Sequence, residues 1–146
     1  MTEQPLPLEK EIGGIFANFP AFPDNVKELL VQIAPWGALI IAVLGGLSVL
    51  SLIGLGSLLT ATSVGVDAYG STWQMWISIL ALGLMAILAV LAFSPLRNRQ
   101  RKGWNYLYYI ELVSIVSSIV TLSFFSAIIG FLIGFWVLFQ TREKYS

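Results

Sequence analysis

The chain has 146 residues, of which 57% are hydrophobic and 11% are charged, and its formal net charge is zero. Soluble domains carry about 25% charged residues, so this composition indicates one compact unit in a membrane and gives no basic excess for nucleic acid. The sequence contains no Cys and no His, which excludes disulfides, thiolate metal ligands and the usual general base at neutral pH. We therefore expect no enzyme activity, no cofactor and no bound metal.

Residues 1–35 are predicted to form an amphipathic leader on the cytoplasmic side. Its apolar residues have helical spacing from Leu8 to Phe19, prolines follow at 20 and 23, and a second short helix is predicted from Asp24 to Ala34. The leader is either a small soluble cap or a pair of helices lying flat on the membrane, and we favour the second because its phenylalanines would otherwise be exposed. Since the segment is net acidic, docking onto the protein's own basic loop can replace attraction to anionic lipid. It lacks the pattern of a cleavable signal.

Residues 36–140 are predicted to form a membrane domain with four transmembrane helices, so the expected fold is an all-α bundle preceded by short amphipathic helices. Pro35 and Trp36 suit the start of the first span. A helix of about 20 apolar residues crosses a hydrocarbon core roughly 30 Å thick. The last span is short, which leaves open whether the third and fourth cross fully or form a tilted hairpin. The predicted spans are 36–59, 73–95, 104–122 and 126–140, followed by a cytoplasmic tail at 141–146.

The basic residues predict the orientation of the chain. With four spans, all eight Lys and Arg residues lie on one side, and the outer loop near Asp67 has none. The positive-inside rule makes that side cytoplasmic, which predicts an inner-membrane protein with both termini in the cytoplasm. The topology-setting basic loop contains Arg97, Arg99, Arg101 and Lys102. We interpret it as a topology signal rather than a ligand site, beside an interfacial aromatic belt of Trp104, Tyr106, Tyr108 and Tyr109.

Small residues predict where helices pack closely. In the first span Ala38, Ala42 and Gly46 lie four residues apart, and Gly130 and Gly134 form a GxxxG motif in the last. Such faces pack two helices of one chain or of two chains, so the motif leaves both possibilities open. The expected partners are the lipid bilayer and either a second copy or a larger membrane complex.

A polar stripe runs along the third predicted span, comprising Tyr108, Glu111, Ser114, Ser118 and Thr121. An ionisable group inside a membrane indicates a functional site by default, and a proton or cation path would use such a stripe. The structural alternative, which we favour, has Glu111 paired with the basic loop and the hydroxyls bonded to backbone carbonyls or to a neighbouring helix.

Residues 103–114, with 133–135, 138–140 and the end of the leader at 33–36, resemble small multi-span membrane proteins of bacterial genomes. The resemblance implies no activity and no functional residues. Slim helix faces and the lack of reactive groups favour a non-enzymatic scaffold or accessory subunit that acts through helix packing. The alternative is a minor transporter or channel subunit that uses the stripe around Glu111.

Overall fold

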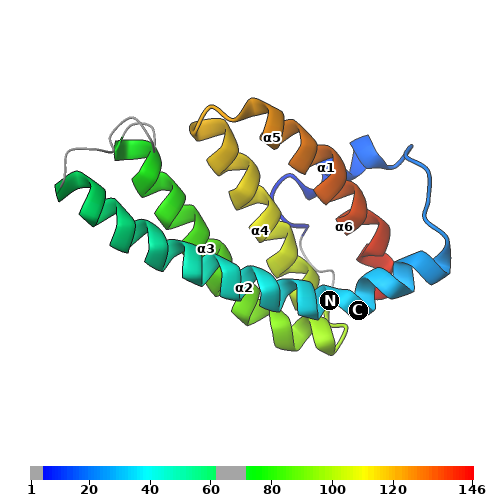
Figure 1. The fold of residues 1–146 in the computed structure, drawn as a ribbon. Helices are drawn as coiled ribbons and strands as arrows, with labels where there is room; N and C mark the ends of the chain where they lie inside the picture. The colour runs from blue at the N-terminus through cyan, green and yellow to red at the C-terminus, as the bar shows by residue number, and fades with distance from the viewer. Residues whose placement is uncertain (1–4, 62–71) are drawn as a thin grey trace.

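The computed structural model describes residues 5–61 and 72–146, and these form helices joined by short connections (Figure 1). The predicted outer loop around Asp67 lies outside the described residues. A short helix, α1, precedes three long helices, and a final helical segment contains a turn of π-helix. The elements are α1 (Glu9–Phe16), α2 (Asp24–Ala61), α3 (Thr72–Arg97), α4 (Arg101–Val120), α5 (Phe124–Ile129), η1 (Gly130–Gly134), α6 (Phe135–Thr141) and η2 (Arg142–Lys144).

The long helices alternate in direction. Helix α3 packs against both α2 and α4, and α4 in turn packs against the segment from α5 to α6, with α1 in contact with α6 (Figure 1). The end of the described chain returns to the connection between α3 and α4, because the Ser146 N–H donates to the Arg99 carbonyl and the Arg101 N–H donates to the Ser146 carbonyl. The start of α2, the α3–α4 connection and the chain end therefore lie at the same end of the bundle.

Three helices in the described part of the chain are long and apolar enough to cross a membrane, where the sequence predicted four. They span Asp24–Gly54, Trp73–Arg97 and Phe124–Lys144. Helix α4 has 20 residues but carries Asn105, Glu111 and several hydroxyls and tyrosines, which lower its hydropathy. The all-α prediction is confirmed, and the third predicted transmembrane helix, at 104–122, is the one that composition does not support.

Helix α2 is one continuous helix of 38 residues, with Pro35 inside it. The sequence predicted a break there, because proline removes one backbone hydrogen bond and crowds the preceding turn. Buried Val31 and Ala38 lie on either side of the proline, and burial of this helix face favours continuation. Pro95 also lies inside its helix, two residues before the end of α3.

The last predicted span differs in two ways from the sequence prediction. The turn lies at residues 121–123, with Leu122 in the left-handed region at φ 61°, rather than at 123–126. The helix that follows is interrupted by five π-helical residues, Gly130–Gly134, which is the GxxxG motif itself. Such π-turns are uncommon and occur often at functional sites.

The core lies toward the end of the bundle that holds the α3–α4 connection and Ser146. Its largest fully buried side chains are Trp104, Tyr108, Phe135 and Leu96. The indole N–H of Trp104 donates to the Leu138 carbonyl at 2.8 Å. The prediction that Trp104 and Tyr108 belong to an interfacial belt is therefore wrong, since both are core residues.

The aromatic residues of the leader pack on α6 and the turn before it. Phe16 is buried and contacts the ring of Phe131, while Phe19 and Phe22 both contact Trp136. The phenylalanine rings of the leader are thus covered by other parts of the protein. Their burial does not require the leader helices to lie flat on the membrane.

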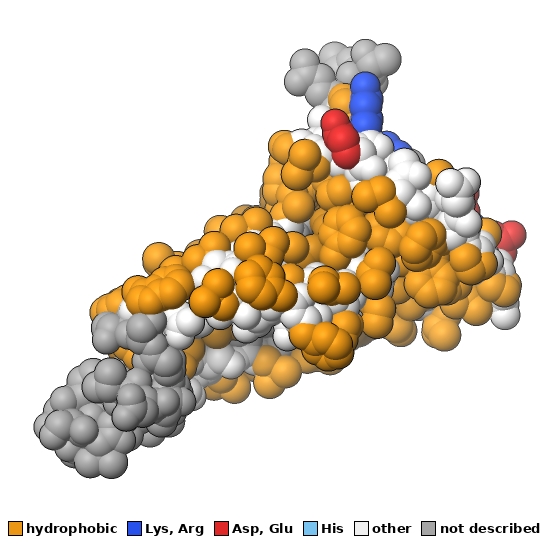
Figure 2. Space-filling model, turned by 90° about the horizontal axis from the view of Figure 1, so that it is seen from above, with side chains coloured by type: hydrophobic (Ala, Val, Ile, Leu, Met, Phe, Trp, Pro, Cys, Tyr) orange, Lys and Arg blue, Asp and Glu red, His pale blue; other side chains and the backbone are white. Residues whose placement is uncertain are grey.

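Hydrophobic side chains cover most of the described surface on the face of the molecule shown in Figure 2. On α2, α3 and α5, large apolar residues such as Leu50, Leu80 and Phe125 are 68%, 70% and 78% exposed. Exposed apolar surface on this scale is rare on soluble monomers and marks contact with lipid or protein.

Candidate functional site

The basic loop and the leader are joined by a buried carboxylate. Glu9, at the start of α1, is 3% exposed, and its Oε1 atom lies 2.6 Å from Nη2 of both Arg101 and Arg142. Its Oε2 atom accepts a hydrogen bond from the Leu6 N–H at 2.7 Å. The Arg101 guanidinium also lies over the Trp104 ring, 4.2 Å from its centroid. One carboxylate thus fastens α1 to the beginning of α4 and to the end of α6.

More exposed ion pairs surround this buried one. Arg99 pairs with Glu28, Lys27 with Glu143, and Lys144 with Asp24. The hydrogen bond that the Arg99 guanidinium donates to the Glu28 carboxylate raises the pKa of Arg99 above its ordinary value. Exposed pairs contribute little stability individually, about 0–1 kcal/mol each. Together they place the charged side chains of the leader, the basic loop and the chain end in one layer, which the predicted docking of an acidic leader on the basic loop requires.

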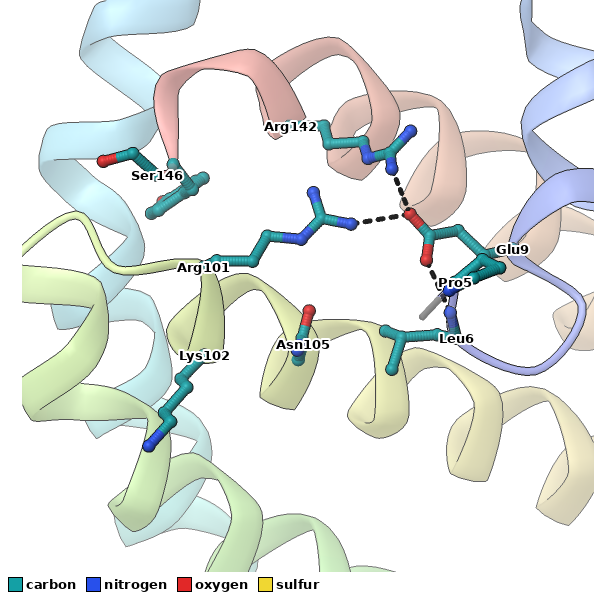
Figure 3. A pocket seen from close by; sticks show the side chains of 9 residues that line it. Pro5, Leu6, Glu9, Arg101, Lys102, Asn105, Arg142 and Ser146 are labelled. Carbon is teal, nitrogen blue, oxygen red and sulfur yellow. Dashed lines mark hydrogen bonds and ion pairs between the residues drawn. The ribbon is translucent and has the colours of Figure 1, made fainter. Parts of the chain in front are cut away.

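A polar cavity of about 550 Å³ opens beside Glu9 (Figure 3). Arg101 and Arg142 reach across it to Glu9, and Lys102 lines its margin with its side chain directed away from that carboxylate. Two residues that sequence reasoning did not single out, Glu9 and Arg142, therefore complete the charged site. The only signal for them was the opposite charge of the leader and the basic loop.

Glu111 does not pair with the basic loop. Among the described residues, its carboxylate has no ion pair or hydrogen bond, and it lies against the π-helical turn. A Cβ atom added at Gly134 would overlap the carboxylate, and one added at Gly130 would lie 3.4 Å from its Oε1 atom. The GxxxG motif therefore packs within the chain, with both glycines on the Glu111 side chain, while Ser126 before it is exposed.

Three other residues of the polar stripe donate hydrogen bonds to backbone carbonyls. The Ser118 hydroxyl donates to the Ser114 carbonyl at 2.9 Å, and the Thr121 hydroxyl donates to the Ser117 carbonyl at 2.8 Å. Tyr108 donates to the Pro7 carbonyl at 2.6 Å and so holds the leader. Bonds of this kind satisfy hydroxyls within a helix without making a path along it.

The three small residues predicted to form one packing face on α2 differ in how closely other helices approach them. Ala38 is buried, Ala42 is half-buried, and a Cβ added at Gly46 would meet nothing within 4 Å. Close approach occurs instead at Gly45, where an added Cβ would lie 3.4 Å from the Ala86 Cβ on α3. Adjacent residues lie about 100° apart around a helix, and spacing along the sequence did not show which of the two glycines faces α3.

A comparison with protein family models, with curated proteins and with solved structures finds no match to this chain.

The contact between Gly134 and Glu111 gives the first prediction. Gly134→Ala should lower the free energy of unfolding in detergent by about 2 kcal/mol, because the new methyl displaces the carboxylate in a packed seam. Adding Glu111→Ala should restore most of this loss, which marks the two positions as coupled. Thermal unfolding of both single variants and the double variant measures the coupling. Gly46→Ala is the control and should be neutral or stabilising; additive losses at 111 and 134 would contradict the contact.

Proposed function

We propose that this chain is a non-enzymatic, multi-span protein of the cytoplasmic membrane that acts as a scaffold or accessory subunit, with both termini in the cytoplasm. The observation that carries the proposal is the division of its surface. Large apolar side chains are exposed along α2, α3 and α5, whereas the ion pairs gather at the end where the leader, the basic loop and the chain end meet. A bilayer accepts such a molecule with its flanks in hydrocarbon and its charged end in water.

Helix α4 acts as the fourth crossing in this proposal. It runs antiparallel between α3 and the segment from α5 to α6, which themselves meet the length and hydropathy required (Figure 1). Its polar groups are tolerated there because they face protein: Trp104 and Tyr108 are buried, and Glu111 packs on the π-turn. An even number of crossings also keeps all the basic residues on one side.

A scaffold role is supported by glycines that have open space beside them in the described part of the chain. Added Cβ atoms at Gly37 and Gly46 on α2, and at Gly83 on α3, would meet nothing within 4 Å. Small residues let a second helix approach closely and gain van der Waals contact in lipid. These faces support packing against a second copy or against a larger membrane complex.

One observation favours a second candidate, a minor transport or channel subunit. Glu111 is a carboxylate with no ion pair or hydrogen bond in the described part of the chain, next to a π-helical turn. Intramembrane carboxylates and irregular helix turns both occur at ion sites. Against it, the Ser118 and Thr121 hydroxyls are bonded to their own helix.

A flux measurement separates the two candidates. In reconstituted vesicles we expect no proton or cation leak above empty vesicles, and Glu111→Gln should leave that baseline and the assembly unchanged. Glu111→Gln keeps the shape of the side chain and removes its charge, so a purely packed carboxylate loses little. A leak through the wild-type protein that Glu111→Gln abolishes would instead establish the transport role.

A further inference from the structure

The polar cavity of about 550 Å³ beside Glu9 is used by neither the scaffold nor the transport role. It lies in the charged layer of the bundle, at the level where lipid phosphates meet a membrane protein, and this placement rests on the proposed function. Its lining side chains include three bases, Arg101, Lys102 and Arg142, against one acid, Glu9. The three positive charges and one negative charge leave the lining with an excess of two positive charges, which favours an anion.

Asn105 adds a polar atom with an unmet requirement. Its Oδ1 atom is buried and has no hydrogen-bond partner among the described residues. Figure 3 shows this oxygen turned toward the side chain of Arg101, on the cavity side of α4. Buried polar atoms in native proteins are satisfied by protein, water or ligand, so this atom calls for a donor. A ligand that carries a hydroxyl beside its phosphate would supply one.

An apolar groove of about 350 Å³ borders the same place. It is lined by residues of α2, α4 and α6, and Tyr145 lines both this groove and the polar cavity. Ile33 and Ile40, on the groove's α2 wall, are 50% and 58% exposed, so the groove opens to the surroundings of the bundle. A polar cavity and an apolar groove that share the Tyr145 wall match an amphiphile better than a free anion.

We propose that these two adjoining cavities bind an anionic phospholipid with a hydroxyl-bearing headgroup. The phosphate would lie at Arg101 and Arg142, with Lys102 turning inward from the margin to reach it, the hydroxyl at Asn105, and an acyl chain in the groove beyond Tyr145. Phosphatidylglycerol has this chemistry, and glycerol phosphate carries the same headgroup without the chains. The lipid would join the charged layer to the membrane at one defined position on the protein.

The test measures binding of phosphatidylglycerol, phosphatidylcholine and glycerol phosphate to the detergent-purified full chain. We expect phosphatidylglycerol to bind more tightly than phosphatidylcholine. Lys102→Gln should weaken phosphatidylglycerol binding about 5-fold, since one surface base contributes about 1 kcal/mol. Arg97→Gln is the matched control, because Arg97 belongs to the same basic loop but does not line the polar cavity, and it should change binding much less.

A second variant tests the groove. Gly37 lines it with open space around its position, so Gly37→Leu should fill it and reduce phosphatidylglycerol binding while leaving glycerol phosphate binding unchanged. Gly46→Leu, at an open position outside the groove, is its control. Equal binding of the two lipids, or no effect of Lys102→Gln, would overturn the site. If Gly37→Leu leaves phosphatidylglycerol binding unchanged, no acyl chain occupies the groove. The polar cavity would then bind a headgroup or free phosphate rather than a lipid.

Extraction separates this inference from the proposed function. Membranes are washed with alkaline carbonate before purification. A chain released by the wash contradicts the membrane assignment and the lipid site together. A chain retained in the membrane that shows no preference between the two lipids contradicts the lipid site alone.

Discussion

Among glycine-to-alanine substitutions in the described part of the chain, Gly103→Ala should lower the stability of the protein most. Gly103 lies at the start of α4, where that helix meets the end of α3, and an added Cβ would lie 2.6 Å from the Leu96 nitrogen and 2.9 Å from the Leu96 Cα. These are backbone atoms, which cannot turn aside as a side chain can. We expect the free energy of unfolding in detergent to fall by about 3 kcal/mol, at the upper end of overpacking costs.

Thermal or denaturant unfolding of the purified variant measures this loss. Gly83→Ala, in the interior of α3, is the matched control, because its added Cβ would meet nothing within 4 Å. It should unfold at or above the wild-type midpoint, since alanine favours a helix over glycine by about 0.5–1 kcal/mol. A Gly103→Ala variant as stable as Gly83→Ala would show that α3 and α4 do not meet as the structure has them.

Glu9→Gln should release α1 from the bundle. The glutamine keeps the size of the side chain but leaves Arg101 and Arg142 without the carboxylate that both contact at 2.6 Å. Removing one partner of a buried charge pair costs about 3 kcal/mol, because the Arg101 guanidinium, which is 15% exposed, stays desolvated without compensation, while the more exposed Arg142 contributes little. Hydrogen exchange should show faster exchange at the amides of α1, and the α6 surface under Phe16 should lose protection with it.

The same helix provides the control for this change. Glu11 is exposed, so Glu11→Gln should leave exchange in α1 close to that of the wild type. The loss in Glu9→Gln should also persist in high salt, since a buried contact is screened far less than the exposed pairs around it. Equal exchange in the Glu9→Gln and Glu11→Gln variants would show that α1 is not held by this carboxylate.

Hydrophobic runs and charge spacing were enough to predict an all-helical molecule with long apolar segments. These signals are local: a run such as 73–95 is apolar in any context, and the helical spacing from Leu8 to Phe19 predicted the leader helix observed as α1. The sequence also predicted that the acidic leader could dock on the basic loop, because opposite charges attract without requiring a particular geometry. It could not identify Glu9 as the central carboxylate, since four other acids stand within residues 1–35.

The predictions failed where tertiary contacts decide. Trp104 and Tyr108 have the composition of an interfacial belt but are buried by α6, whose position no local pattern reports. Pro35 is an ordinary helix starter in sequence, yet packing on both sides keeps α2 continuous. The GxxxG glycines were predicted as a helix seam, and their neighbour is the carboxylate of Glu111, a partner that spacing along one helix cannot reveal.

The central claim is a multi-span protein with its charged end in the cytoplasm, and site-directed labelling tests it most directly. The chain has no cysteine, so one cysteine at Asp67 or at Asn98 gives an unambiguous reporter. In intact cells an impermeant maleimide should label the Asp67→Cys variant, whereas the Asn98→Cys variant should be labelled only after permeabilisation. Labelling of both positions from the same side, or labelling in the reverse order, would contradict the account.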